Sequence, residues 1–276
     1  MSRSRVGALP GSPAGLSLAA LVLIAFFSLP VVVLVARAFG VDGGLARALT
    51  DPVVLSALGL SLVTTIVSLA LTILLGTPLA YALATRSVPA ARLVETIVDL
   101  PIVLPPSVAG LALLLLLGRR GPVGDLLAQA GLDLAFTTAA VVLAQLFVSA
   151  PLYVRSARTG FRAVGRDVVE AARVDGASDM ALFGRVMLPL AASAIGSGAI
   201  LAWVRALGEF GATILFAGNI EGRTQTLPLL VYSSLQSSLG AAIATAAVLV
   251  VAALAVLLGV RSFAERGAAA ASLDAG

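Results

Sequence analysis

The 276-residue chain is 59% hydrophobic and 12% charged, a composition typical of a protein that crosses a membrane several times. It has no lysine, histidine or cysteine, so all 18 basic residues are arginine. These absences exclude a nucleotide-binding loop that needs lysine, a catalytic pair that needs histidine, and a metal site built from histidine or cysteine. The net charge of +4 is too small and too dispersed to favour nucleic acid, and is better interpreted as a topology signal.

The first two long uncharged runs predict two membrane-spanning helices. Residues 16–36 lack charge over 21 positions, and a helix rising about 1.5 Å per residue then crosses a hydrocarbon core of about 30 Å. This run exceeds the apolar region of a cleaved signal peptide, so we expect a retained helix after a cytoplasmic tail over residues 1–15. Residues 55–85 predict one long helix that Gly76 and Pro78 can bend, with serines and threonines facing protein rather than lipid.

Prolines distinguish the third predicted span. A short basic loop over residues 86–99 leads into this span, residues 100–118, which opens with Leu-Pro-Ile-Val-Leu-Pro-Pro. Pro101, Pro105 and Pro106 cannot all sit in a regular helix, so we expect the start of the span to be extended or broken. Broken backbone at membrane depth must be covered by protein or line a cavity, which favours a pathway; a kinked helix start at the membrane interface is the alternative.

Three further uncharged or weakly charged runs complete a prediction of six transmembrane helices in an all-α, polytopic membrane protein. These spans cover residues 134–154, 190–217 and 241–260, separated by connectors over residues 119–133 and 218–240. The transmembrane domain therefore covers residues 16–262, and a cytoplasmic tail over residues 263–276 follows it.

The distribution of arginine predicts the orientation of these spans. Twelve arginines fall on the side that holds both termini and the longest charged loop, and five fall on the other side. Cytoplasmic segments of membrane proteins are enriched in basic residues. Both termini and the loop over residues 167–189 are therefore expected in the cytoplasm, with the protein in the plasma (inner) membrane.

The loop over residues 167–189 predicts two short helices joined at a glycine. Asp167 and Glu170 have the spacing of a capping box, and Gly176 suits the left-handed residue that ends a helix. Ser178 can cap the second helix. An ordered helical hairpin in a charged loop favours a docking surface for a partner over an ordinary surface loop.

Polar residues in and near the fifth span are candidates for a substrate pathway. Arg205 and Glu209 are four residues apart, so a helix places them on one face, where they either lock helix packing or line the pathway. Gly208 and Gly211 beside them permit close helix approach. Arginine, amide and hydroxyl donors in the following connector can bind an oxyanion or simply cap the local loop. The complete candidate set is Pro105, Pro106, Ser107, Arg205, Glu209, Thr213, Asn219, Arg223, Thr224, Gln225 and Thr226.

The segment Glu170-Ala171-Ala172, with Gly176 and Leu188-Pro189, resembles the EAA loop of ABC importer permeases. In that pattern three residues separate E-A-A from the glycine, and a hydrophobic residue, here Val186, precedes L-P. In the family this loop docks into a cleft of the ATP-hydrolysing subunit. The resemblance gives the coupling role to Glu170, Ala171, Ala172, Asp175, Gly176, Ala177, Phe183, Leu188 and Pro189.

Two further stretches, residues 100–121 and 205–232, are similar to the permease subunit of molybdate/tungstate importers in the sulfate/tungstate uptake permease family. Sulfate importers share Gly-Glu-Phe-Gly-Ala and the later Leu-Pro, whereas Asn219-Ile220 and Gly222–Pro228 look more like the molybdate/tungstate branch. The resemblance covers about residues 58–261 and implies a type I ABC importer permease fold.

The resemblance implies a non-enzymatic subunit, without a cofactor, of an ATP-driven importer that moves a tetrahedral oxyanion, molybdate or tungstate, into the cytoplasm. Its implied partners are a second copy of the chain, two ABC ATPase subunits at the cytoplasmic loop, an extracytoplasmic oxyanion-binding protein and the lipid bilayer. A sulfate or other oxyanion permease is the main alternative. An ATP-independent channel or secondary transporter is less favoured, because Glu209, already offset by Arg205, is the only firm intramembrane carboxylate.

Overall fold

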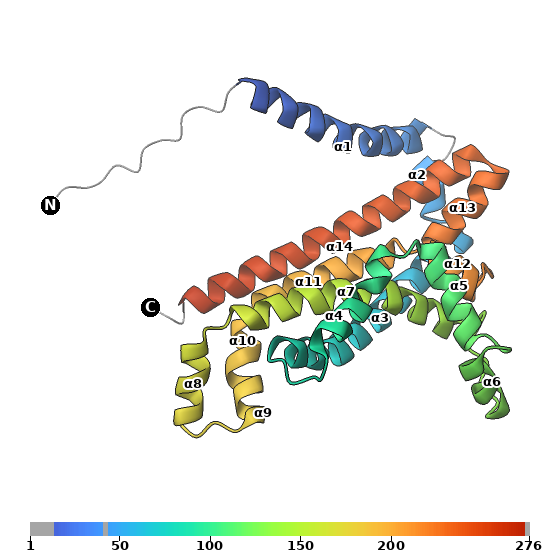
Figure 1. The fold of residues 1–276 in the computed structure, drawn as a ribbon. Helices are drawn as coiled ribbons and strands as arrows, with labels where there is room; N and C mark the ends of the chain where they lie inside the picture. The colour runs from blue at the N-terminus through green and yellow to red at the C-terminus, as the bar shows by residue number, and fades with distance from the viewer. Residues whose placement is uncertain (1–13, 41–43, 274–276) are drawn as a thin grey trace.

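The structure, a computed structural model, describes the backbone of residues 14–40 and 44–273 and the side chains of residues 18–40 and 44–258. Over these residues all regular structure is helical, which confirms the predicted all-α class (Figure 1). The predicted tail over residues 1–15 lies outside the described residues except for its last two, which begin α1. The long helices are α1 (Ala14–Gly40), α3 (Pro52–Ala84), α7 (Thr138–Ala163), α11 (Ala192–Leu207) and α14 (Leu239–Leu273).

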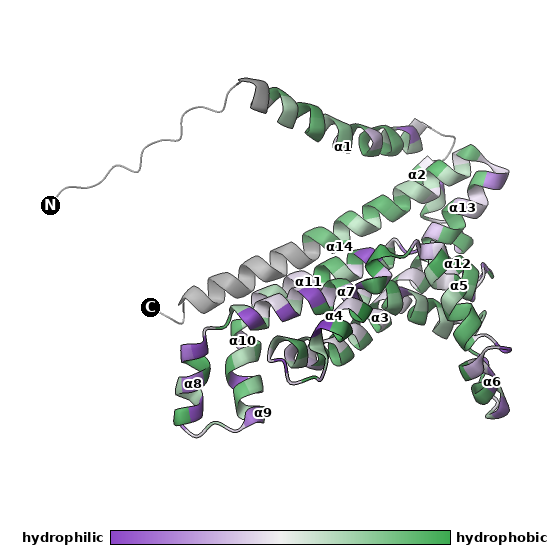
Figure 2. Ribbon diagram, in the orientation of Figure 1, coloured by the Kyte–Doolittle hydropathy of each residue, from purple (hydrophilic) through white to green (hydrophobic). Residues whose placement is uncertain are grey.

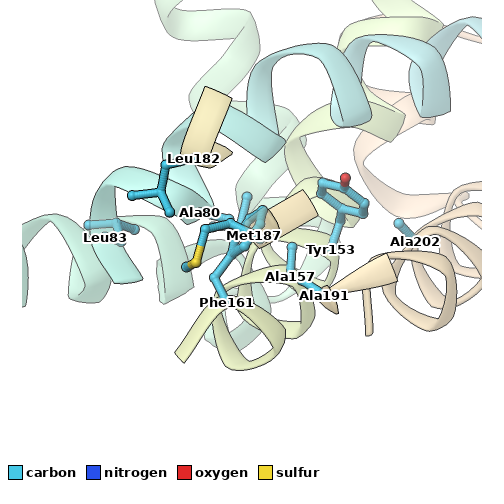
Figure 3. Close-up of a cluster of buried hydrophobic side chains, with 10 residues drawn as sticks. Ala80, Leu83, Tyr153, Ala157, Phe161, Leu182, Met187, Ala191 and Ala202 are labelled. Atoms are coloured by element: carbon cyan, nitrogen blue, oxygen red, sulfur yellow. The ribbon is translucent and has the colours of Figure 1, made fainter. Parts of the chain in front are cut away.

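Helices α3, α7 and α11 form the centre of the bundle, and α14 packs along α11 and α13 (Leu227–Ser237). Figure 3 shows the main apolar cluster between α3, α7 and the segment before α11, where Leu83, Tyr153, Phe161 and Met187 are each at most 5% exposed. Tyr153 also shares a hydrogen bond of 2.5 Å with Thr77 of α3. This cluster fixes the ends of the three central helices relative to one another.

Ser61, Thr64, Thr65 and Ser68 in the first half of α3 are buried against protein, as predicted. Three of these hydroxyls join other elements: Thr64 Oγ1 accepts from Gln145 Nε2 at 3.2 Å, and Thr65 Oγ1 accepts from Trp203 Nε1 at 3.1 Å. Ser61 Oγ accepts from the backbone N–H that begins α13 at 2.8 Å. In a membrane, such contacts satisfy polar groups that lipid cannot, so they orient α3 toward α7 and α11.

The number of apolar helices agrees with the six predicted spans. Four helices are long and apolar enough to cross a membrane, and the count is six if each of two bent helix pairs forms one span. Figure 2 shows that α1 and the coloured part of α14 are mostly hydrophobic, whereas hydrophilic residues gather on α6 (Pro122–Gln129) and α8 (Arg166–Val174). Helix α1 lies apart from the centre of the bundle in Figure 1 and contacts mainly α14 and the short α2 (Gly44–Ala48).

The third span differs from the prediction of a loop followed by one helix. Helix α4 (Ala91–Val103) occupies most of the predicted loop over residues 86–99, and it is bent by 116° from α5 (Pro106–Leu117). The break itself confirms the expected disruption by proline. Pro105 has an extended backbone (ψ 136°), and Pro106 takes the first helical position of α5, where its missing N–H costs nothing.

The predicted fifth span over residues 190–217 is also broken and does not form one continuous helix. Helix α11 ends at Leu207, and α12 (Gly211–Phe216) begins after an irregular step at Phe210. The predicted connectors over residues 119–133 and 218–240 contain α6 and α13, and α14 continues through the predicted tail to Leu273. Helices α6 and α13 are too short to be found by a search for long apolar runs, and α14 extends beyond the end of its apolar run.

Candidate docking hairpin and substrate pathway

The docking hairpin, residues 165–190, projects from the bundle between the ends of α7 and α11 (Figure 1). Its first limb is α8. Its second limb runs continuously through α9 (Asp179–Ala181), the π-helix η1 (Leu182–Met187) and α10 (Leu188–Leu190), then bends by 71° into α11. Two helical limbs joined at a glycine are therefore confirmed. A π-helical stretch is uncommon and often occurs at functional sites.

Local hydrogen bonds shape the tip of the hairpin. Gly176 has the predicted left-handed conformation (φ +82°), and its N–H bonds to Arg173 O at 3.0 Å, while Ala177 N–H bonds to Ala172 O at 2.9 Å. This is the Schellman arrangement, which satisfies the last carbonyl groups of a helix. Ser178 caps the second limb as predicted, because its Oγ accepts from Ala181 N at 3.3 Å. The turn is therefore specified by its own residues.

The predicted capping box of Asp167 and Glu170 is not present. The N-cap residue of α8 is Gly165, which has no side chain to accept a hydrogen bond. The helix begins two residues too early for the box, so both acidic residues lie inside it. Asp167 falls in the first turn, where a negative charge still interacts favourably with the helix dipole.

The second limb anchors the hairpin to the bundle. Leu182 and Met187 are 2% and 5% exposed within the cluster of Figure 3. The ring of Phe183 packs edge-on against Tyr81 at 4.8 Å between centroids, and Tyr81 packs against Phe161 at 5.5 Å. Aromatic pairs of this geometry stabilise beyond their buried area. The second limb is therefore packed directly against α3 and α7.

The first limb and the tip remain open. Every residue of α8 is at least partly exposed, including Glu170 and Ala171 of the predicted coupling set. Val174 is 86% exposed and Met180 is 78% exposed, beside the charged pair Arg173–Asp179. Exposed apolar side chains rimmed by charge are typical of a protein interface. Sequence reasoning did not select Val174 or Met180, although their position beside the glycine turn could have indicated them.

The remaining coupling candidates divide between the two limbs. Ala172 and Ala177 are half-buried at the turn, and Asp175 is exposed as the C-cap of α8. Leu188 is half-buried and Pro189 is exposed in the last turn before the bend. The structure thus brings the predicted coupling residues into one hairpin, with an open limb and an anchored one.

The breaks in the third and fifth spans meet. A Cβ added to Gly211 would lie 2.8 Å from Pro106 Cβ, and one added to Gly110 would lie 2.6 Å from Ala212 O, so α5 and α12 touch through glycine. The predicted close approach at Gly211 is confirmed. Gly208 makes no comparable contact: a Cβ there would have Val204 O as its nearest described neighbour, at 3.8 Å. The two interrupted helices therefore form one locus, and discontinuous helices of this kind mark substrate sites in many transporters.

The Arg205–Glu209 pair spans the break in the fifth helix. Glu209 is 1% exposed; its Oε2 lies 2.7 Å from Arg205 Nη1, and its Oε1 accepts from Ala212 N at 2.8 Å. One carboxylate thus joins the last turn of α11 to the first turn of α12. Thr213, another candidate, is fully buried one turn further on. Pro105, Pro106 and Ser107 are exposed in the single chain.

The candidate residues in the connector after α12, residues 219–226, form hydrogen bonds mainly within the connector and with α13. Thr224 Oγ1 accepts from Ile220 N at 2.9 Å, which is the local capping role weighed as an alternative. Asn219 Nδ2 donates to Ser233 Oγ at 2.6 Å, and Arg223 is exposed. Gln225 and Thr226 are buried beneath this loop. Among the described residues, no hydrogen bond or ion pair joins this group to Arg205 or Glu209.

A bundle of apolar helices with two broken spans and a projecting polar hairpin is typical of a membrane transport subunit. Residues 72–264 match the family model described as binding-protein-dependent transport system inner membrane component, and the chain belongs to this family. The protein is therefore an integral inner-membrane transport subunit and not itself an enzyme.

The matched relatives cover most of the chain. The molybdenum transport system permease protein ModB of Mycobacterium tuberculosis is 44% identical over 90% of this chain and 93% of its own length. The sulfate transport system permease protein CysW of Synechococcus elongatus is 37% identical over 71% of this chain and 70% of its own. A bacterial alginate ABC transporter, solved with an alginate-bound periplasmic protein, has the same fold: one of its chains matches with a TM-score of 0.72 at 18% identity, covering 92% of this chain and 93% of that one.

Proposed function

We propose that this chain is the membrane-spanning subunit of an ATP-driven importer for a tetrahedral oxyanion, and that the oxyanion is molybdate or tungstate. The observation that carries the substrate is the 44% identity to a molybdenum transport permease over nine-tenths of the chain. Family membership supports the importer class. The match to a sulfate permease is shorter and weaker, so sulfate is the second candidate.

The docking hairpin is proposed to receive the ATPase. The chain has no lysine and hence no lysine-containing phosphate-binding loop, so ATP hydrolysis belongs to a separate subunit. Its exposed first limb offers Glu170 and Val174, the tip offers Met180 at the start of the second limb, and the rest of the second limb, which is anchored, passes movement to α3 and α7. ATP binding must favour one state by a few kcal/mol to shift the population, and a rigid hairpin transmits that bias.

A second copy of the chain is proposed to complete the pathway. Pro105, Pro106 and Ser107 lie exposed at the locus of the broken helices, so a single chain leaves the locus open on one side. Two copies would close it and would present two hairpins to two ATPase subunits. An extracytoplasmic binding protein delivers the oxyanion to the opposite face, consistent with the family description.

Arg205 is proposed to keep the pathway attractive to an anion without trapping it. Its side chain is 32% exposed, and Glu209 already neutralises much of its charge. Passage needs binding that is favourable but weak, and neutral hydroxyl and amide donors supply the rest. An arginine without its carboxylate would hold a dianion more tightly and release it more slowly.

Uptake into proteoliposomes tests the substrate. The complex of this chain with its ATPase and binding protein is supplied with ATP inside and radiolabelled molybdate outside. We expect ATP-dependent uptake that excess tungstate abolishes and excess sulfate leaves nearly unchanged. Competition by sulfate equal to that by tungstate would overturn the molybdate/tungstate assignment in favour of the sulfate candidate.

Co-purification tests the docking role independently of substrate. Glu170→Lys reverses a charge on the open limb and should abolish co-purification of the ATPase, with the permease still folded. Glu221→Lys reverses an exposed charge in the connector before α13 and is the matched control, which should retain the ATPase. Equal retention by both variants would contradict docking at the hairpin.

A further inference from the structure

We propose that Glu95 is a positioning residue that clamps α4 to the end of α7, so that the docking hairpin and the broken third span move as one unit. This inference rests on the proposed importer function. Sequence reasoning placed Glu95 in a loop and gave it no role, because its partners lie more than sixty residues away along the chain.

One carboxylate contacts two arginines from the next element. Glu95 Oε2 lies 3.2 Å from Arg158 Nη1, and Glu95 Oε1 lies 2.5 Å from Arg162 Nη2. Arg162 Nη2 also donates to Leu83 O at 3.3 Å, near the end of α3. Three helices, α3, α4 and α7, therefore meet through one charged cluster.

The burial of this cluster separates it from ordinary surface ion pairs. The side chains of Glu95 and Arg158 are 23% and 12% exposed, and that of Arg162 at the edge of the cluster is 42% exposed. By contrast, the pair Arg119–Asp133 is 79% and 57% exposed, and exposed pairs contribute little. Partly desolvated, charge-assisted contacts hold geometry more firmly, and removing one partner leaves the other charges unpaired.

The position of the clamp connects the two functional regions. Arg162 lies one residue before the end of α7, and only Val164 and Gly165 separate α7 from the first limb of the docking hairpin. Glu95 lies on α4, which runs directly into the break at Leu104. The second limb of the hairpin contacts α7 through the rings of Phe183 and Phe161. Helix α4 packs against the same cluster through apolar residues. The clamp adds a charged contact to this apolar packing and fixes the position of α4 along α7.

The first test measures coupling. In the reconstituted complex, Glu95→Gln removes the charge with little change in shape. We expect ATP hydrolysis to stay within about twofold of wild type, while oxyanion uptake per ATP hydrolysed falls by about tenfold, the scale of one lost charge-assisted contact. Asp99→Asn removes a carboxylate one turn further along α4 that makes no ion pair with any described residue, and it should keep the wild-type ratio. An unchanged ratio in Glu95→Gln, or a parallel loss of both activities, would overturn the clamp.

The second test measures distance and needs no transport. The chain has no native cysteine, so spin labels can be placed at Thr96→Cys on α4 and Thr159→Cys on α7, both exposed, in complexes diluted with unlabelled chain. The label distance should stay the same with and without ATP. A shift of about 5 Å, one helical turn, would show that α4 slides on α7 and would refute the clamp. If the wild-type complex transported no oxyanion, the proposed function would be wrong. The label distance between residues 96 and 159 would still show whether α4 and α7 move together.

Discussion

Glu209 uses its two carboxylate oxygens on the two sides of the break between α11 and α12. Its charge is offset by Arg205, and its second oxygen accepts a backbone N–H that has no partner in a short helix. A buried charge is tolerated only when it is paired and hydrogen-bonded in this way. The break in the fifth span is therefore held by one residue.

Replacing Glu209 should destabilise the protein. Glu209→Ala leaves Arg205 without its ion pair and Ala212 N–H without an acceptor, at an expected cost of about 3 kcal/mol. Thermal unfolding of the purified complex in detergent measures this. Glu221→Ala, an exposed carboxylate, is the control and should unfold at the wild-type temperature. Equal melting of the two variants would contradict the bridging role.

A side chain at Gly110 should destabilise the contact between α5 and α12. A Cβ at this position would lie within 3.0 Å of three backbone atoms of Ala212, which cannot move aside as a flexible side chain could. We expect Gly110→Ala to cost about 2 kcal/mol by forcing α5 and α12 apart, and to reduce transport. Gly59→Ala on α3 is the control, since nothing described lies within 4 Å of its added Cβ. A neutral Gly110→Ala would show that the two helices are not in contact.

At the scale of elements, the docking hairpin combines an open limb with an anchored one. The open limb ends in a Schellman turn that its own residues specify. The anchored limb depends on contacts with α3 and α7 that come from far along the chain. This division of roles suits a coupling element. The open limb is accessible to a partner protein, and the anchored limb is held rigidly against α3 and α7.

Variants of two apolar residues in the second limb should distinguish an effect on stability from an effect on ATPase binding. Phe183→Ala removes an aromatic contact with Tyr81 and should lower the free energy of unfolding by about 2–3 kcal/mol. Met180→Ala removes a side chain that is 78% exposed, so it should leave unfolding unchanged and weaken ATPase binding instead. Thermal unfolding and ATPase titration are measured on both variants. If Met180→Ala bound the ATPase as wild type does, the tip would not belong to the interface.

At the scale of the whole molecule, the spans separate two polar ends. The docking hairpin projects at one end of the bundle, and α6 projects elsewhere, near the end of α5 (Figure 1). The arginine distribution predicts that the hairpin faces the cytoplasm. With no native cysteine, this orientation can be tested with single introduced thiols.

A membrane-impermeant maleimide should label the two ends from opposite sides. Gln129→Cys lies exposed at the end of α6, and Met180→Cys lies exposed on the hairpin. In intact spheroplasts we expect labelling at residue 129 only, and in lysed cells at both. Labelling at residue 180 before lysis would reverse the proposed orientation.

The chain's own sequence determines what depends on local chemistry. Uncharged runs longer than 20 residues indicate helices in a membrane, because lipid satisfies no backbone polar group. Gly176 and Ser178 specify the turn of the hairpin through bonds to near neighbours, and the prolines at 105 and 106 specify a break. The capping box failed because the start of a helix can shift by one or two residues at little cost, and α8 begins two residues early.

Only the tertiary structure decides which distant elements meet. It places Gly211 against Pro106 so that two broken helices form one locus, and it brings Glu95 to Arg158 and Arg162. It also identifies α4 within a predicted loop. These contacts depend on close packing and partial desolvation between helices far apart in the chain, and neither hydropathy nor spacing carries that information.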